Sequence, residues 1–184
     1  MTSKEINSDI SIILQNSRFE KILSLLLDEL DSKKEIIRDQ PYNWSLTHMI
    51  SCSQICKILA VSRDIDIEIS AIAGAVHDLA IIRTGKFDDH GPLGAPMVRE
   101  FLHNYNEEFG EEYGLISSEE INIIVQATHN HSFKKDFTNN IFDELIKDAD
   151  SLDRFLHGKK TYEYYYTRSK SALLDLGIKI EDII

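Results

Sequence analysis

The sequence is poor in the residues and patterns that mark β-proteins. Its 184 residues include only three prolines and eight glycines. No Asn-Gly or Asp-Gly pair offers a tight hairpin turn, and no segment sustains the alternation of apolar and polar residues expected of a half-buried strand. We therefore predict an all-α fold.

Long apolar runs are also missing. No stretch approaches the roughly 20 consecutive apolar residues that a membrane-spanning helix needs. The first residues, MTSKEINSDISIIL, lack the apolar core of a signal peptide. We therefore expect a cytoplasmic protein that does not associate with membranes.

Positive charge is scarce relative to negative charge. There are 31 Asp and Glu residues against 20 Lys and Arg, which gives a net charge of −11. This balance repels phosphate backbones at long range and disfavours general nucleic-acid binding. A small phosphorylated substrate remains compatible, because a bound divalent cation can dominate the field inside a pocket. The sequence leaves the oligomeric state open.

Cysteine occurs only at positions 52 and 56, inside an apolar periodic segment. We interpret Cys52 and Cys56 as small, reduced residues of the core. An alternative is a zinc site formed by His48, Cys52 and Cys56, which would lie on one helical stripe. This alternative is less favoured, because the chain lacks the close CxxC pairs of structural zinc modules.

The sequence does contain a series of amphipathic helices. Hydrophobic residues make up 42% and charged residues 28%, a globular composition, and the length fits one domain. Residues 104–114 are polar and acidic, so we predict a loop or a frayed helix end there. The apolar periodicity predicts helices at 19–30, 44–61, 65–79, 92–105, 117–128, 141–152 and 159–176.

Local signals refine this outline. Ser117 and Glu120 have the spacing of a capping box at a helix start, and Gly177 suits a helix end. Gly74 would allow another element to approach closely. Tyrosines at positions 162 and 164–166 are expected to pack the last helix onto the domain, with a stacking platform for a base or sugar as the less favoured alternative.

The residues with the clearest chemistry are His77 and Asp78. On one helix, consecutive side chains project about 100° apart, so both reach one cation only beside a groove between helices. His48 on an inward stripe and Asp150 at a helix end could complete the site. Two imidazoles and two carboxylates suit Mn, Fe, Co, Ni or Zn. Taken singly, each residue could instead be a hydrogen-bonded core histidine or a helix-capping aspartate.

Five segments together resemble the HD-domain phosphohydrolase superfamily, whose pattern is H…HD…D on a helical bundle. The resemblance covers about residues 44–155, and the matching segments are WSLTHMI, AIAGAVHDLA, DHGPLGAPMVREFL, QATHNHS and KDADSLDRF. It implies a single-domain helical bundle, with residues 1–40 as a helical extension, 41–158 as the HD domain and 159–184 as a completing helix.

The resemblance also implies a function. One or two divalent ions (Mn, Fe, Co, Ni, Zn or Mg) would be held by His48, His77, Asp78 and Asp150. Water activated by the metal would hydrolyse a phosphoester or phosphoanhydride of a small phosphorylated metabolite or nucleotide. Asp78, next to His77, is the best candidate for the general base, by proximity.

Further residues near the motif have two interpretations each. His90 and His131 match positions that serve a second metal or the substrate phosphate in many members of the superfamily, and His129 is the less favoured of its pair. Alternatively, His90 caps its helix and the other two are exposed at a helix end.

The charged residues near the motif also have two interpretations each. Lys86 and Arg83, in the loop after the HD pair, could bind the substrate phosphate or be solvated loop charges. Asp153 could support a ligating histidine or be an exposed helix carboxylate.

Two rival functions remain at this level. The same ligand set could hold redox-active iron in an HD-type di-iron oxygenase. It could also belong to a non-catalytic regulatory module that binds a metal or ligand.

Overall fold

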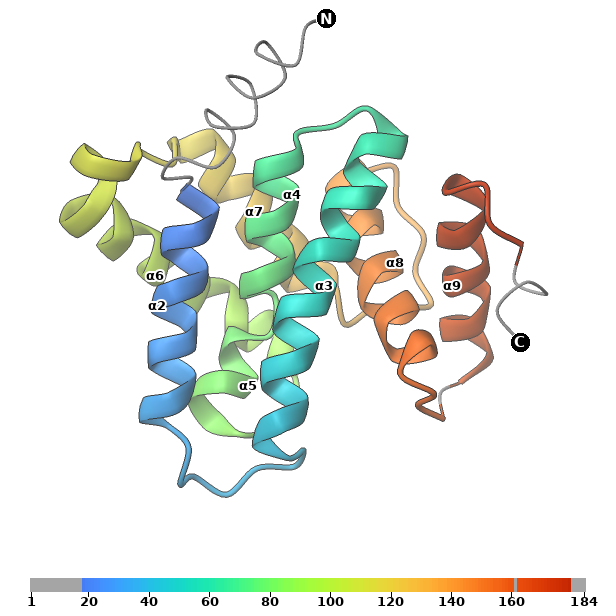
Figure 1. Cartoon of the computed structure of the whole chain (residues 1–184), viewed down its shortest axis with the longest axis horizontal. Helices are drawn as coiled ribbons and strands as arrows, with labels where there is room; N and C mark the ends of the chain where they lie inside the picture. Colours follow the sequence, from blue (N-terminus) through green and yellow to red (C-terminus); the bar gives the residue numbers. More distant parts are fainter. Residues whose placement is uncertain (1–17, 161, 180–184) are drawn as a thin grey trace, which may run out of the picture.

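The computed structural model describes residues 18–160 and 162–179, and every regular element in this part of the chain is a helix (Figure 1). The all-α prediction is therefore confirmed. The helices are α2 (Arg18–Ser32), α3 (Tyr42–Arg63), α4 (Ile67–Val76), α5 (Leu79–Thr84), α6 (His90–Tyr113), α7 (Ser118–Asn130), α8 (Ile141–Leu156) and α9 (Glu163–Asp175).

The helices form where apolar stripes and caps predicted them. The stripe of α2 is buried at Phe19, Ile22 and Leu26. Helix α7 begins with the predicted capping box, in which the Ser117 side chain accepts from the Glu120 backbone and the Glu120 side chain accepts from the Ser117 backbone. Each such pairing satisfies N–H groups that a helix start leaves without partners.

The prediction of a loop or a frayed helix end at residues 104–114 is wrong, because α6 continues as a regular helix to Tyr113. Tyr105 is 1% exposed, and Asn106 exchanges side-chain hydrogen bonds with the backbone of Ile116. These contacts hold the helix and the following segment together. Gly110 lies inside the helix and does not end it. A Cβ at this position would collide with the Leu115 side chain. It provides room for that side chain.

The predicted helix at 65–79 is interrupted. Helix α4 ends at Val76, and the short α5 starts at Leu79. At Asp78 the backbone leaves helical values, with φ −100° and ψ 21°. Apolar residues continue on both sides of the break, so periodicity could not reveal it. His77 and Asp78 consequently lie in the junction between two helices, with His77 at the end of α4 and Asp78 at the start of α5.

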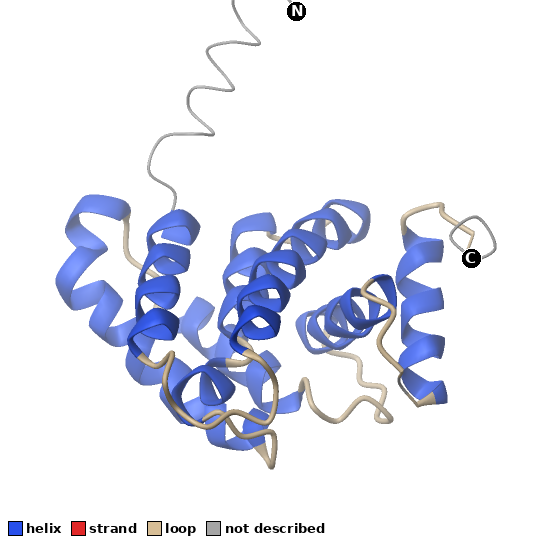
Figure 2. Ribbon diagram, turned by 60° about the horizontal axis from the view of Figure 1, so that its bottom comes forward, coloured by secondary structure: helices blue, strands red, loops and turns tan. Residues whose placement is uncertain are grey.

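Each helix of the bundle packs against two or more of the others. Helix α4 contacts α2 and α3, α8 contacts α3, α7 and α9, and α6 contacts α7. Figures 1 and 2 show α9 at the edge of the bundle beside α8. The division of the chain into extension, central domain and completing helix stays a prediction.

Close packing of α3 on α4 depends on small residues. A Cβ at Gly74 would lie 2.6 Å from Cys56 Sγ and 3.0 Å from Ser53 Cα, so this glycine has the role predicted for it. Cys52 and Cys56 are fully buried free thiols among the apolar core residues. In the described residues neither joins a cluster suited to a metal ion, which favours core packing over the zinc alternative.

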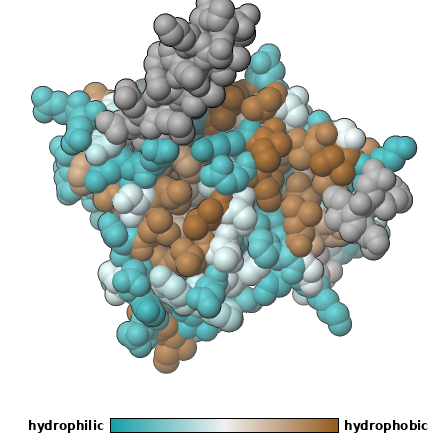
Figure 3. Space-filling model, viewed as in Figure 1, coloured by the Kyte–Doolittle hydropathy of each residue, from teal (hydrophilic) through white to brown (hydrophobic). Residues whose placement is uncertain are grey.

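The surface carries some apolar side chains. Ile58 and Val61 on α3 are 55% and 65% exposed. Figure 3 shows apolar areas on the face of the molecule where α3 lies. Among the helices of residues 18–160 and 162–179, none is long and apolar enough to cross a membrane.

Candidate metal centre

Four imidazoles and two carboxylates from separate elements meet in the interior. His48 lies in the middle of α3, His77 and Asp78 form the junction between α4 and α5, and Asp150 lies on α8. His90 begins α6, and His131 caps the end of α7. The tertiary structure thus brings together residues separated by as many as 102 positions.

Asp78 is at the centre of this cluster. Its Oδ2 lies 3.5 Å from Nε2 of His48 and 3.5 Å from Nε2 of His77. Its Oδ1 lies 3.5 Å from Nε2 of His90 and 3.3 Å from Nε2 of His131. Each carboxylate oxygen therefore faces a different pair of imidazoles.

The imidazole rings form a continuous row. Ring centroids of His48 and His77 are 5.1 Å apart, those of His77 and His131 are 4.9 Å apart, and those of His131 and His90 are 4.8 Å apart. With metal–nitrogen bonds of about 2.1 Å, rings this close can share or flank an ion.

Three of the histidines are oriented in the same way. In each, Nδ1 lies within hydrogen-bonding distance of the carbonyl oxygen three residues earlier. These contacts join His77 to Gly74 at 2.7 Å, His90 to Phe87 at 2.6 Å and His131 to Thr128 at 2.6 Å. A carbonyl only accepts, so Nδ1 carries the proton and Nε2 keeps its lone pair for the cluster.

His48 is oriented by a carboxylate. Its Nδ1 lies 2.5 Å from Oδ2 of Asp153, whose other oxygen accepts from the hydroxyl of Ser51. Asp153 is 1% exposed and not a solvated helix carboxylate. Its contacts are those of a group that fixes the ring of a metal-binding histidine. On its other side, Nε2 of His48 lies 3.2 Å from Oδ1 of Asp150.

Several buried atoms of the cluster have no hydrogen-bond partner in the described residues. They are Nε2 of His48, His77 and His131 and Oδ1 of Asp78. Buried polar atoms are rarely left unpaired, because each costs about 1–3 kcal/mol. Bound cations would satisfy such atoms, and the sets His48/His77/Asp78, His77/His131/Asp150 and Asp78/His90/His131 each have ligand atoms within 4.8 Å of one another. The cluster is therefore able to bind a metal ion.

Burial and neighbouring charges set the protonation of these groups. Burial lowers the pKa of His77, and it lowers that of His131 to about 3. Burial also opposes protonation of His48, but Asp150 and Asp153 outweigh it and raise that pKa to about 9. Burial favours the neutral form of Asp78, yet the surrounding imidazoles hold its pKa well below the usual range.

Two cations beside the cluster were not found by sequence reasoning. Lys134 is 2% exposed, and its ammonium group lies 2.6 Å from Oδ2 of Asp150 and donates to the carbonyl of His131. Nε of Arg154 donates to Oδ1 of Asp150 at 2.7 Å. Lys134 lies between helices, where no periodicity predicts burial. Arg154 follows Asp150 by four residues, a spacing that could have suggested the contact.

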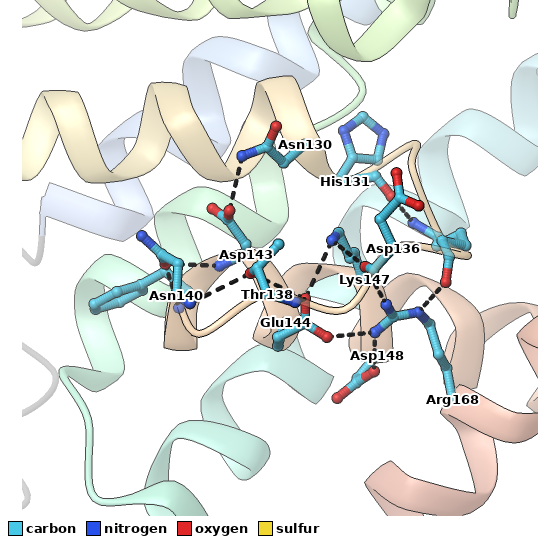
Figure 4. Close-up of polar contacts among 12 residues, drawn as sticks. Asn130, His131, Asp136, Thr138, Asn140, Asp143, Glu144, Lys147, Asp148 and Arg168 are labelled. Carbon is cyan, nitrogen blue, oxygen red and sulfur yellow. Dashed lines mark hydrogen bonds and ion pairs between the residues drawn. The ribbon is translucent and has the colours of Figure 1, made fainter.

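The segment that carries Lys134 is fixed by a buried arginine. Arg168 on α9 donates to the carbonyls of Lys134 at 2.5 Å and Asp136 at 2.8 Å. It also contacts Glu144 at 2.8 Å and Asp148 at 2.9 Å on α8 (Figure 4). Helix α9 therefore stabilises the loop after His131 and, through it, the position of Lys134.

Three other predicted residues lie apart from the cluster. His129 is exposed and its Nδ1 contacts the Asn130 side chain. Arg83 pairs with Glu29 at 2.5 Å, and Lys86, whose side chain is 56% exposed, pairs with Asp39 at 2.8 Å. The roles predicted for these three residues stay predictions.

Comparisons with known proteins agree with this arrangement. The family model described as the HD domain matches residues 45–154. A search of curated proteins gave no match. A search of solved structures gave none either.

Proposed function

The chain belongs to the HD-domain family, and we propose that it hydrolyses a phosphoester or phosphoanhydride bond in a small phosphorylated metabolite or nucleotide. Members of the family are mostly metal-dependent hydrolases. The observation that carries the proposal is the convergence of buried imidazole nitrogens without hydrogen-bond partners on the two oxygens of Asp78.

The proposed ligands are assigned according to which oxygen of Asp78 each histidine faces. His48, His77, Asp78 and Asp150 are the proposed ligands of a first divalent cation, drawn from Mn, Fe, Co, Ni, Zn and Mg. His90 and His131 face the other oxygen of Asp78 and are positioned for a second ion or for the substrate phosphate. When bound, the cation supplies Lewis acidity and lowers the pKa of a coordinated water.

Groups of the protein orient the histidines and keep Asp78 negatively charged. Backbone carbonyls fix His77 and His131 with Nε2 turned inward, and Asp153 does the same for His48. Asp78 stays ionised, so it can accept a proton from attacking water as the proposed general base. Because the site is buried, bulk water is excluded and the electrostatic interactions of Asp78 and the histidines are stronger.

Metal analysis of the purified chain, combined with a phosphate-release screen over nucleotides and phosphomonoesters, tests this function. We expect bound metal and turnover in the wild type, and loss of both in His77→Ala and Asp78→Ala. Arg99→Gln is the control, because Arg99 is exposed on α6 and, among the described residues, bonds only the Asn122 side chain.

The same experiment separates the rival functions. Bound iron with oxygen consumption and no phosphate release would indicate an oxygenase. Bound metal with neither reaction would indicate a binding module. A wild type that binds no divalent metal would contradict both the hydrolase and the oxygenase.

A further inference from the structure

We propose that Arg154 is the residue that binds the phosphate of the substrate beside the metal centre. This inference rests on the proposed function and deepens it. It concerns a side chain that the family pattern of histidines and aspartates does not include.

The guanidinium of Arg154 is only partly used by the protein. Its Nε donates to Asp150 Oδ1 at 2.7 Å, which points the head group toward the cluster. Within residues 18–160 and 162–179, no acceptor bonds to its two terminal nitrogens. The side chain is 15% exposed. Four N–H bonds are therefore free to meet an incoming anion, in the planar arrangement that suits two phosphate oxygens.

Three aromatic rings from different elements surround this guanidinium. Its carbon lies 5.8 Å from the ring centroid of Trp44, 5.9 Å from that of Phe87 and 6.0 Å from that of Tyr165. Trp44 lies in the first turn of α3, Phe87 precedes α6, and Tyr165 belongs to the tyrosine-rich start of α9. Contacts on several sides hold the cation in place before a ligand binds, which reduces the entropy lost on binding.

The guanidinium also shares two of its aromatic neighbours with a small cavity beside Asp78. A small cavity between α3 and α5 is lined by Trp44 and Phe87 and reaches Asp78. Two of the three rings around Arg154 therefore also line the space next to the central carboxylate.

The local charge leaves Arg154 available for a ligand. Asp150 is already paired with the buried ammonium of Lys134 at 2.6 Å and faces His48 at 3.2 Å. Arg154 is thus not its only counter-charge. A structural ion pair alone would explain Nε but not the open terminal nitrogens.

Inorganic phosphate binding to the full-length purified chain, with its metal content measured, tests the inference. We expect Arg154→Gln to weaken phosphate binding about tenfold or more, because a charge-assisted contact is lost. Arg99→Gln, the same substitution on an exposed arginine, should bind as the wild type does. Arg83→Gln and Lys86→Gln test the alternative phosphate-binding residues in the same titration.

A second variant separates ligand binding from support of Asp150. Arg154→Lys keeps a positive charge near Asp150 but cannot offer two parallel N–H bonds, so we expect full metal content with phosphate binding at least threefold weaker.

Phosphate binding within threefold of the wild type in Arg154→Gln would overturn the inference. The inference would also be overturned if phosphate binding in Arg154→Gln and Arg154→Lys decreased only in proportion to their metal content. A wild type that binds no phosphate would overturn it as well. Absence of turnover in the substrate screen would overturn the proposed function instead and leave this comparison valid.

Discussion

Replacing Arg168 with methionine should strongly destabilise the protein, because it removes a buried cation and leaves its partners behind. The Arg168 side chain is 0% exposed, whereas those of Glu144 and Asp148 are 17% and 8% exposed. Its contacts with the Lys134 and Asp136 carbonyls are lost as well. Methionine fills part of the volume without offering a hydrogen bond, so among the described residues Glu144 keeps only Lys147 and Asp148 keeps only Arg63 as a counter-charge in largely buried positions.

The size of the effect follows from this burial. Breaking a buried ion pair from one side costs about 3–5 kcal/mol. For a chain of this length, each kcal/mol lowers the melting temperature by about 2–4 °C, so the total decrease should be about 6–20 °C. The neighbouring loop should lose hydrogen-exchange protection first, because Arg168 binds two of its carbonyls.

Urea unfolding followed by fluorescence of Trp44, the single tryptophan, measures the change. Trp44 is 9% exposed and stacks on His48 with ring centroids 5.1 Å apart, so its emission reports on the core next to the metal centre. Arg99→Met serves as the control, with an expected change within about 0.5 kcal/mol. A loss below about 1 kcal/mol in Arg168→Met would refute the reasoning.

Two further predictions concern His48 and Gly74. The pKa of His48 is raised to about 9, so the metal-free protein gains stability from its protonation below the unfolded pKa of 6.5 and loses that gain as pH rises through 9. Metal must displace this proton, so its apparent affinity should increase up to about tenfold per pH unit from 6.5 to 8.5 in chelator competition, and a flat profile would contradict this. Gly74→Ala places a Cβ 2.6 Å from Cys56 Sγ and should cost about 1–3 kcal/mol in urea unfolding. The double variant with Cys56→Ala should recover part of that loss, and no recovery would point to another cause.

The sequence predicted the helices well where apolar periodicity and caps agreed. The buried stripe of α2 and the capping box of α7 depend on residues within a few positions of each other, and such local interactions can be read from one chain. The interruption after Val76 and the continuation of α6 to Tyr113 leave no mark in the apolar periodicity and were missed.

The sequence by itself determined which chemistry was available: an H…HD…D spacing of imidazoles and carboxylates on inward helical stripes. Only the tertiary structure decided which side chains meet. Contacts of Asp153 with His48, and of Lys134 with Asp150, join residues that no local period relates. The pairing of Arg83 with Glu29, across 54 positions, is equally invisible in the sequence. Local periodicity gives the face of a helix on which a residue lies, but the partner of that face is set by how all the helices pack.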